Sequence, residues 1–123
     1  MDRRAFLRTL PALGVLAGMA SSLAQDLEPI TLAKPQTEGG KSVLEALSQR
    51  RTTRNISSDK LPPQMLSNLL WAAFGVNRQQ GPFGGPGRTA ASASNSQEID
   101  LYVALPEGVY LYDAAAHRLM PVV

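Results

Sequence analysis

The sequence predicts an α+β fold in which two amphipathic helices precede a three-stranded antiparallel meander. Apolar residues recur at helical spacing through residues 42–74, and they alternate with polar residues through much of 99–123. A stretch rich in glycine and proline, residues 75–88, separates the two patterns. The chain has 123 residues, which is enough for one domain at most.

The first 24 residues are typical of an export signal. Three arginines precede a short apolar run at residues 10–20. The run is shorter than the roughly 20 apolar residues that a membrane-spanning helix needs. Small residues at Ser22 and Ala24 suit signal peptidase, so we expect cleavage after Ala24.

The arginines themselves indicate a particular export route. Residues 3–8, Arg-Arg-Ala-Phe-Leu-Arg, resemble the twin-arginine consensus, with Asp2 in place of the usual Ser or Thr. The alternative is a general secretory signal, or an N-terminal anchor, that happens to carry three arginines. The resemblance implies passage through the twin-arginine translocase and a periplasmic or otherwise exported mature protein.

Charge and cysteine content exclude several classes of function. The chain has 12 Lys and Arg against 10 Asp and Glu, and loss of Asp2 with the three signal arginines leaves nine of each. The basic balance therefore belongs to the signal and does not indicate nucleic-acid binding. Because the chain has no cysteine, a thiolate nucleophile and a cysteine metal site are excluded, and His117 alone does not make a metal cluster. We expect an organic cofactor or none.

The first helix is predicted to start at Ser42 and to end near Arg50 or Arg51. Ser42 can cap the helix, and Glu45 three residues later completes a capping-box pattern. One face of this helix is apolar: Val43, Leu44 and Leu47. The threonine-rich segment that follows favours extended backbone.

The second helix is predicted over Pro63–Phe74. Pro63 suits the first helical turn, where its missing N–H group costs little. The apolar positions of this helix are Met65, Leu66, Leu69, Leu70, Ala73 and Phe74, widened by Trp71 and Ala72. Gly75 ends the helix, and the glycines and prolines after it predict a loop over residues 76–88.

The C-terminal third predicts the meander. Residues 99–105 alternate between apolar and polar side chains, and a tight turn at 106–108 follows. Residues 109–112 then form an antiparallel second strand, and a turn at 113–117 leads to a third strand at 118–123.

These elements are few for the apolar surface that they carry. Residues 25–41 are expected to form a polar lead-in and residues 42–123 the domain. A domain of this size buries a low fraction of its surface. We therefore expect a partner chain, or a further half of the protein, to cover the apolar faces.

Two segments carry residues that could bind a ligand. The first holds three arginines and two hydroxyls: Arg50, Arg51, Thr52, Thr53 and Arg54. Guanidinium forks match phosphate oxygens, and a threonine hydroxyl can add a hydrogen bond. The alternative is that these cations are stabilised by the helix dipole and are otherwise solvated.

The second segment, residues 91–97, consists of small and polar side chains. Its central residues are Ser92, Ala93, Ser94 and Asn95. Small side chains let a flat ring approach the backbone, and Ser and Asn can bond to carbonyl and imide edges. The alternative is an ordinary polar loop that precedes a strand.

Taken together and in order, four segments resemble the nitroreductase-like flavoproteins, which bind FMN. Residues 50–54 are similar to the family's Arg-Arg-Ser-x-Arg motif, and residues 69–78 fit its Leu-Leu-Trp-Ala-Ala-x-Gly-Val-Asn-Arg run. Residues 88–97 match an Arg-Thr-x-Pro-Ser-x-x-Asn-Ser-Gln segment, with alanine where proline is common. The Gly-Val-Tyr-x-Tyr-Asp run at 108–113 recurs in one branch. The resemblance covers residues 42–123.

The resemblance implies an FMN site shared between the subunits of an intertwined homodimer. Arg50, Thr52 and Arg54 would hold the phosphate and the polar edge of the flavin, with Arg51 beside them. Residues 92–95 of the other subunit would line the isoalloxazine or its tail. The implied reaction is ping-pong hydride transfer, in which NAD(P)H reduces the flavin and the flavin reduces a nitroaromatic, a quinone or a similar acceptor. It assigns no catalytic side chain.

Family members continue well beyond the meander, so the resemblance implies the N-terminal portion of the nitroreductase-like fold only. Two alternatives to a nitroreductase remain. The first is the branch of the family that oxidises azoline rings in modified peptides, which the run at residues 69–73 and the tyrosine-rich meander favour somewhat. The second is a non-catalytic truncated fragment that cannot hold flavin alone.

Overall fold

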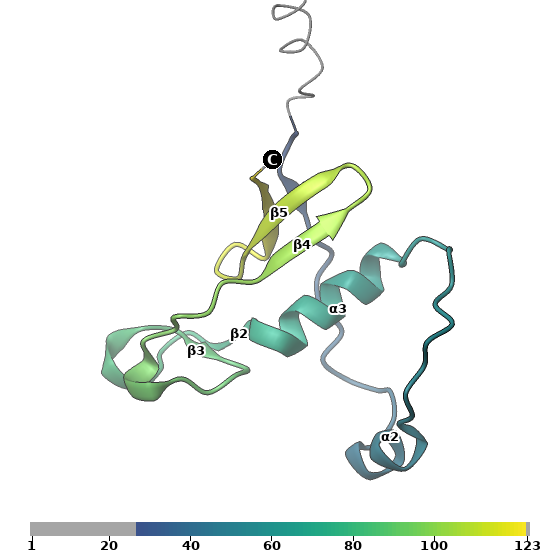
Figure 1. Ribbon diagram of the computed structural model, residues 1–123. Coiled ribbons are helices and arrows are strands. Elements are labelled where there is room, and N and C mark those ends of the chain that lie inside the picture. Colours follow the sequence, from purple (N-terminus) through teal and green to yellow (C-terminus); the bar gives the residue numbers. More distant parts are fainter. Residues whose placement is uncertain (1–26, 123) are drawn as a thin grey trace, which may run out of the picture.

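The computed structural model describes residues 27–122, so the signal segment and its expected cleavage site lie outside the described residues. A four-stranded antiparallel sheet and the helix that crosses it form the body of the fold (Figure 1). A short helix lies apart from the sheet, and a small hairpin lies at the end of the crossing helix. The α+β class predicted from the sequence is confirmed.

The short helix, α2, spans Val43–Gln49 and begins where the sequence predicts. The Oγ atom of Ser42 accepts a hydrogen bond of 3.2 Å from the backbone N–H of Glu45, which satisfies one free donor of the first turn. The Glu45 carboxylate accepts from the side chain of Gln49 instead of closing a capping box. No residue of α2 is buried, so nothing described covers its apolar face.

The crossing helix, α3, spans Pro63–Phe74, with the bounds predicted from the sequence. Proline occupies its first position, and the backbone N–H of Gly75 closes the last turn on Trp71 O at 2.7 Å. A Cβ atom at Gly75 would collide with Cδ1 of the Trp71 ring. Glycine is therefore required by space at this helix end.

Strands β4, β5 and β6 form the predicted meander. Their bounds are Tyr102–Leu105 for β4, Gly108–Asp113 for β5 and Arg118–Pro121 for β6. β5 pairs with β4 on one side and with β6 on the other, and both pairs are antiparallel. The prediction that the first strand begins at Ile99 is wrong: β4 begins three residues later, where Tyr102 first faces a partner, Leu111.

A fourth strand, β1, spans Ile30–Thr31 and extends the sheet beyond β6. The sheet order is β1-β6-β5-β4. The lead-in that the sequence places outside the domain thus takes part in the fold. Gln36 strengthens this attachment, because its backbone N–H donates to the side chain of Asn68 on α3 at 2.8 Å.

The prediction of a featureless loop over residues 76–88 is also wrong. Val76–Arg78 and Gly87–Arg88 form strands β2 and β3, which pair as a small irregular hairpin. Two short 3₁₀ turns, η2 at Pro82–Gly84 and η3 at Ala93–Asn95, lie against each other beside it. Glycine permits the tight closure here, since a Cβ atom on Gly81 would lie 2.9 Å from Gly85 O.

The core lies between α3 and the inner face of the sheet. Its buried apolar residues are Leu70, Tyr110, Tyr112, Ala114 and Leu119. Five such residues are a small core, and large apolar side chains remain exposed on both helices. Met65 and Leu69 on α3 are each more than half exposed, as are the apolar residues of α2. None of the described helices is long and apolar enough to cross a membrane.

Candidate functional site

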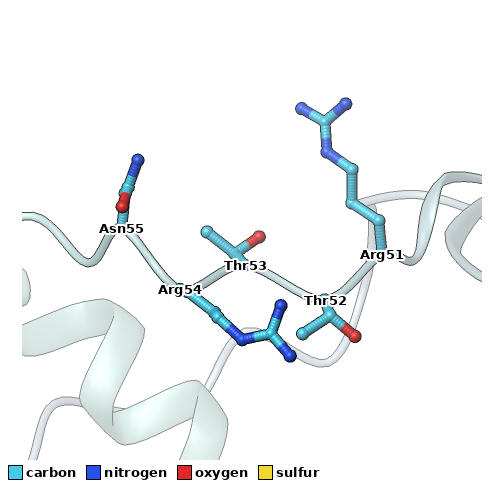
Figure 2. A pocket seen from close by; sticks show the side chains of 5 residues that line it. All are labelled: Arg51, Thr52, Thr53, Arg54 and Asn55. Atoms are coloured by element: carbon cyan, nitrogen blue, oxygen red, sulfur yellow. The ribbon is translucent and has the colours of Figure 1, made fainter.

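The arginine-rich segment leaves α2 as extended chain. Arg50, the residue that caps α2, already has extended backbone angles, φ −63° and ψ 124°. Successive side chains of an extended chain point to opposite sides. Figure 2 shows this alternation, with Arg51 and Thr53 on one side of the chain and Thr52 and Arg54 on the other.

This alternation divides the predicted phosphate residues into two groups. Thr52 and Arg54 share one side of the chain, and we expect Arg50, two residues before Thr52, on the same side. Arg51 points to the other side of the chain, away from Arg54. The residues from Arg51 to Asn55 line a shallow cavity of about 290 Å³.

The segment is positively charged and open to solvent. Every residue from position 50 to position 55 is exposed. The guanidinium groups of Arg50, Arg51 and Arg54 form no ion pair with any described residue. Their hydrogen-bond donors are thus available to an anionic ligand, and guanidinium pairs with phosphate through charge-assisted hydrogen bonds.

The second predicted segment is a tightly bonded loop. Ser94 and Asn95 have left-handed backbone angles, φ 51° and 57°, and so does Gln97 at 53°. The side chain of Ser92 accepts from the backbone N–H of Gln97 at 3.2 Å, which closes the loop. Ala93 and Ser94 are exposed at its tip, whereas Ser92 and Asn95 are half-buried.

Within one chain the two predicted segments are not brought together. The arginines lie beside α2 and before the start of α3, whereas the loop at η3 lies beyond the other end of α3, beside the β2–β3 hairpin (Figure 1). The prediction that they meet across two subunits remains a prediction, because one chain alone is described.

Sequence reasoning gave no role to Arg88 and Gln97 within this loop region. Gln97 Oε1 accepts a hydrogen bond from Arg88 Nε at 2.8 Å, and Gln97 Nε2 donates to Pro86 O at 2.7 Å. Arg88 Cζ also lies 5.0 Å from the centre of the Phe74 ring. The available signal in the sequence was their position at the two ends of the third family motif, residues 88–97.

A polar cluster beneath α3 was also missed. Ser67 is fully buried, and its Oγ atom contacts both Ala33 O and His117 Nε2. Tyr112 Oη lies 2.9 Å from His117 Nδ1. Burial raises the pKa of the Tyr112 hydroxyl, an effect opposed by the nearby positive charge of Arg88 and reinforced by Asp113. The signal in the sequence was a serine in the middle of a helix, on the face that also carries Leu70.

The turn between β5 and β6 is held by Asp113. Its carboxylate accepts from the backbone N–H groups of Ala115 and Ala116, each at 3.1 Å, and from Arg118 Nε at 3.2 Å. The backbone hydrogen bond from Ala116 is the largest cause that holds the Asp113 pKa below its usual value, and Arg118 adds to it. Asp113 therefore has a structural part and lies outside the candidate site. The described residues contain no cluster of three or more potential metal-ligating His, Cys, Asp and Glu side chains.

Comparisons with known proteins agree with these observations. The model of the nitroreductase family matches residues 47–123. The crystal structure of a candidate nitroreductase from Ralstonia eutropha JMP134 is 42% identical in sequence and superposes with a TM-score of 0.70. The match covers 80% of this chain and 45% of that one, so the chain spans less than half of the length of this relative. No curated protein matches the chain.

The family match includes the arginine-rich segment, α3, the loop at η3 and the whole meander. Both the sequence model and the superposed structure thus point to the same assignment, and the predicted fold class is confirmed with them. The chain belongs to the nitroreductase family.

Proposed function

We propose that this chain is a subunit of an FMN-dependent oxidoreductase of the nitroreductase type. The observation that carries the proposal is the side-chain alternation after α2, which places Thr52 and Arg54 on one exposed edge. Arg50 belongs to the same edge by the period of the extended chain. Two guanidinium groups and a hydroxyl are a donor set that fits a phosphate monoester.

The loop at η3 suits the flat part of the same cofactor. Ala93 and Ser94 are exposed and small, so a ring can lie against the backbone there. Bound FMN would supply hydride transfer between NAD(P)H and an acceptor such as a nitroaromatic or a quinone. The side chains of this chain would bind the phosphate and orient the ring. None of the described candidates is placed as an acid or a base.

A complete site requires a second copy of the chain in this proposal. The phosphate edge and the loop lie beyond opposite ends of α3 (Figure 1). Val43 and Leu44 on α2 are 75% and 79% exposed, and Met65 and Leu69 on α3 are 58% and 59% exposed. Burial of such surface is the main driving force for subunit association. We therefore propose a homodimer.

Export completes the proposal. The twin-arginine pattern at residues 3–8 and the expected cleavage after Ala24 indicate passage through the twin-arginine translocase to the periplasm. That route carries folded proteins, and it therefore suits a protein that receives its cofactor in the cytoplasm.

The azoline-oxidising branch of the family loses part of its support. The tyrosine-rich meander favoured it in the sequence, but Tyr110 and Tyr112 are only 2% and 6% exposed. These two side chains form the core and do not face a substrate. Packing thus explains Tyr110 and Tyr112, whereas Tyr102 at the start of β4 is 60% exposed and keeps part of that support.

Subunit complementation tests the shared site. One variant carries Arg50→Ala with Arg54→Ala, and the other carries Ser94→Trp, which fills the loop tip. Each alone should lose FMN, whereas mixed and refolded subunits should recover about a quarter of the wild-type flavin, since half of the dimers are mixed and each mixed dimer has one intact site. No recovery in the mixture would contradict a site shared between subunits, and a colourless, folded wild-type dimer would reject the flavin assignment itself.

A further inference from the structure

We propose that Arg88 and Gln97 are positioning residues that hold the loop of residues 92–95 in the shape that binds the flavin. The proposal deepens the function proposed above and rests on it. We call the two residues, with their mutual hydrogen bond, the Arg88–Gln97 clasp. The loop has no regular secondary structure beyond one 3₁₀ turn, so its shape depends on side-chain contacts of this kind.

The side chain of Gln97 uses both ends of its amide group. Nε2 donates to Pro86 O at 2.7 Å and to Asn95 Oδ1 at 2.9 Å. Oε1 accepts from Arg88 Nε at 2.8 Å. A flipped amide would place its oxygen against two other oxygens and its NH₂ group against a donor. The network therefore fixes the orientation of the amide.

The backbone of Gln97 closes the same loop from its other side. Its N–H group donates to Ser92 Oγ, so a single residue is bonded near both ends of the segment. Ser94, Asn95 and Gln97 all have positive, left-handed φ angles, which residues other than glycine rarely adopt. Such strained positions persist only when the surroundings determine them, and they cluster at ligand-binding sites. In this proposal the clasp holds the strained shape together with two backbone hydrogen bonds of the loop, from Asn95 N–H to Ser92 O and from Ser96 N–H to Ala93 O.

The clasp is anchored to a rigid element. Arg88 pairs with Val76 in the β2–β3 hairpin, and its guanidinium group lies over the ring of Phe74 at the end of α3. The next residue, Thr89, donates from its backbone to Gly75 O at 2.9 Å and from its hydroxyl to Trp71 O at 3.1 Å. The loop is thus attached through Gln97 and Arg88 to the C-terminal end of α3.

In this arrangement the four predicted ring-binding residues, 92–95, have two different roles. Ser92 accepts from the clasp through its hydroxyl, and Asn95 accepts through its amide oxygen. Ala93 and Ser94 remain exposed between them. The clasp consequently presents the tip of the loop to a ligand, while the half-buried pair keeps the tip in place.

Gln97→Glu in the full-length chain tests the clasp, because it preserves shape but removes both amide donors. At neutral pH the carboxylate faces Pro86 O and Asn95 Oδ1 with no proton to donate. We expect FMN to bind roughly tenfold to a hundredfold more weakly than to the wild type, as measured by flavin fluorescence. Gln80→Glu is the matched control, because it adds the same charge at an exposed position of the hairpin connection.

The pH dependence separates positioning from a general loss of structure. Acidification protonates the new carboxyl group and restores one donor, so the ratio of variant to wild-type dissociation constants should fall as the pH falls. Arg88 favours the ionised carboxylate, whereas the two facing oxygens favour the protonated form. The pH at which the new carboxyl group titrates is therefore taken from the measured ratio. The ratio also cancels the titration of the FMN phosphate, which occurs near pH ~6.

A second variant keeps the test decisive if Gln97→Glu does not fold. Arg88→Lys retains the charge but lacks the planar fork, and it should weaken FMN binding without any recovery at low pH. Wild-type affinity in both variants would overturn the clasp while leaving the flavin assignment intact. Weakened binding by Gln97→Glu with no change of the ratio at low pH would also overturn it. A wild-type protein that binds no FMN would reject the function and the clasp together.

Discussion

His117 Nε2 lies 2.8 Å from Ser67 Oγ, and this contact joins two residues that are 50 positions apart in the chain. Ser67 donates its hydroxyl proton to Ala33 O, so its oxygen is the acceptor toward His117. The Nε2–H tautomer then fits the network, because Nδ1 is left to accept from the Tyr112 hydroxyl. The contact ties α3, the β5–β6 turn and the lead-in segment together.

Ser67→Ala should lower the free energy of unfolding by about 1–3 kcal/mol, because it leaves buried polar groups with fewer partners. Chemical denaturation measures the loss. Ser48→Ala is the control, since Ser48 is exposed on α2 and should change the free energy by less than about 0.5 kcal/mol. Equal effects of the two substitutions would show that the buried contact contributes nothing specific.

Arg50→Ala combined with Arg54→Ala should lower FMN affinity at least tenfold, as each charge-assisted hydrogen bond contributes about 1.5–3 kcal/mol. Arg51→Ala is the matched control, because Arg51 points to the opposite side of the same extended chain. Its effect should be clearly smaller, and circular dichroism should show that all variants keep their helices. Flavin retained in full by the double variant would remove the phosphate role from this edge.

The stability provided by Asp113 should depend on pH in the acid range. Folding lowers the pKa of Asp113, so its carboxylate stabilises the folded state fully when the pH lies above the unfolded-state pKa of about 3.9. This contribution to the free energy of unfolding is lost as the pH falls through the lower pKa of the folded state. Asp113→Asn keeps an acceptor for the turn but loses the ion pair with Arg118. The wild type should melt at a higher temperature than the variant at pH 6, and the difference should close toward pH 3. A constant difference across this range would contradict the assignment.

Export should depend on the paired arginines. Arg3→Lys combined with Arg4→Lys preserves the charge but removes the pattern that the twin-arginine translocase recognises. We expect the unprocessed form to accumulate in the cytoplasm, as cell fractionation and N-terminal sequencing would show. Arg8→Lys is the control and should export normally. Processing of the double variant after Ala24 at the wild-type rate would point to the general secretory route.

Local signals were sufficient to predict α3 and most of the meander. Pro63 at the start, Gly75 at the end and the helical spacing between them are sufficient to predict the bounds of α3. Strand β5 likewise follows from alternation between two turns. In these elements the pattern of one segment agrees with its tertiary surroundings.

The parts of the fold that the sequence did not predict either have distant partners or are too short to produce a periodic pattern. β1 has two residues, and only its pairing with Leu119 and Arg118 makes it a strand. The β2–β3 hairpin is short and irregular, so it produces no periodic signal. The sequence gives no sign of the contact between Ser67 and His117, because the two residues are 50 positions apart and belong to no shared pattern. Family motifs indicated the candidate site residues, whereas the hydrogen bond between Arg88 and Gln97 is evident only in the folded chain.

The isolation of α2 has a consequence for the filling of the site. A helix of seven residues with no buried side chain is marginal in water, so its exit angle toward Arg50 is not fixed by the subunit alone. In the proposed homodimer, pairing of the subunits and occupancy of the shared site would therefore be linked. The cofactor would favour the paired state, and at a given cofactor concentration occupancy would fall as the subunits become scarcer.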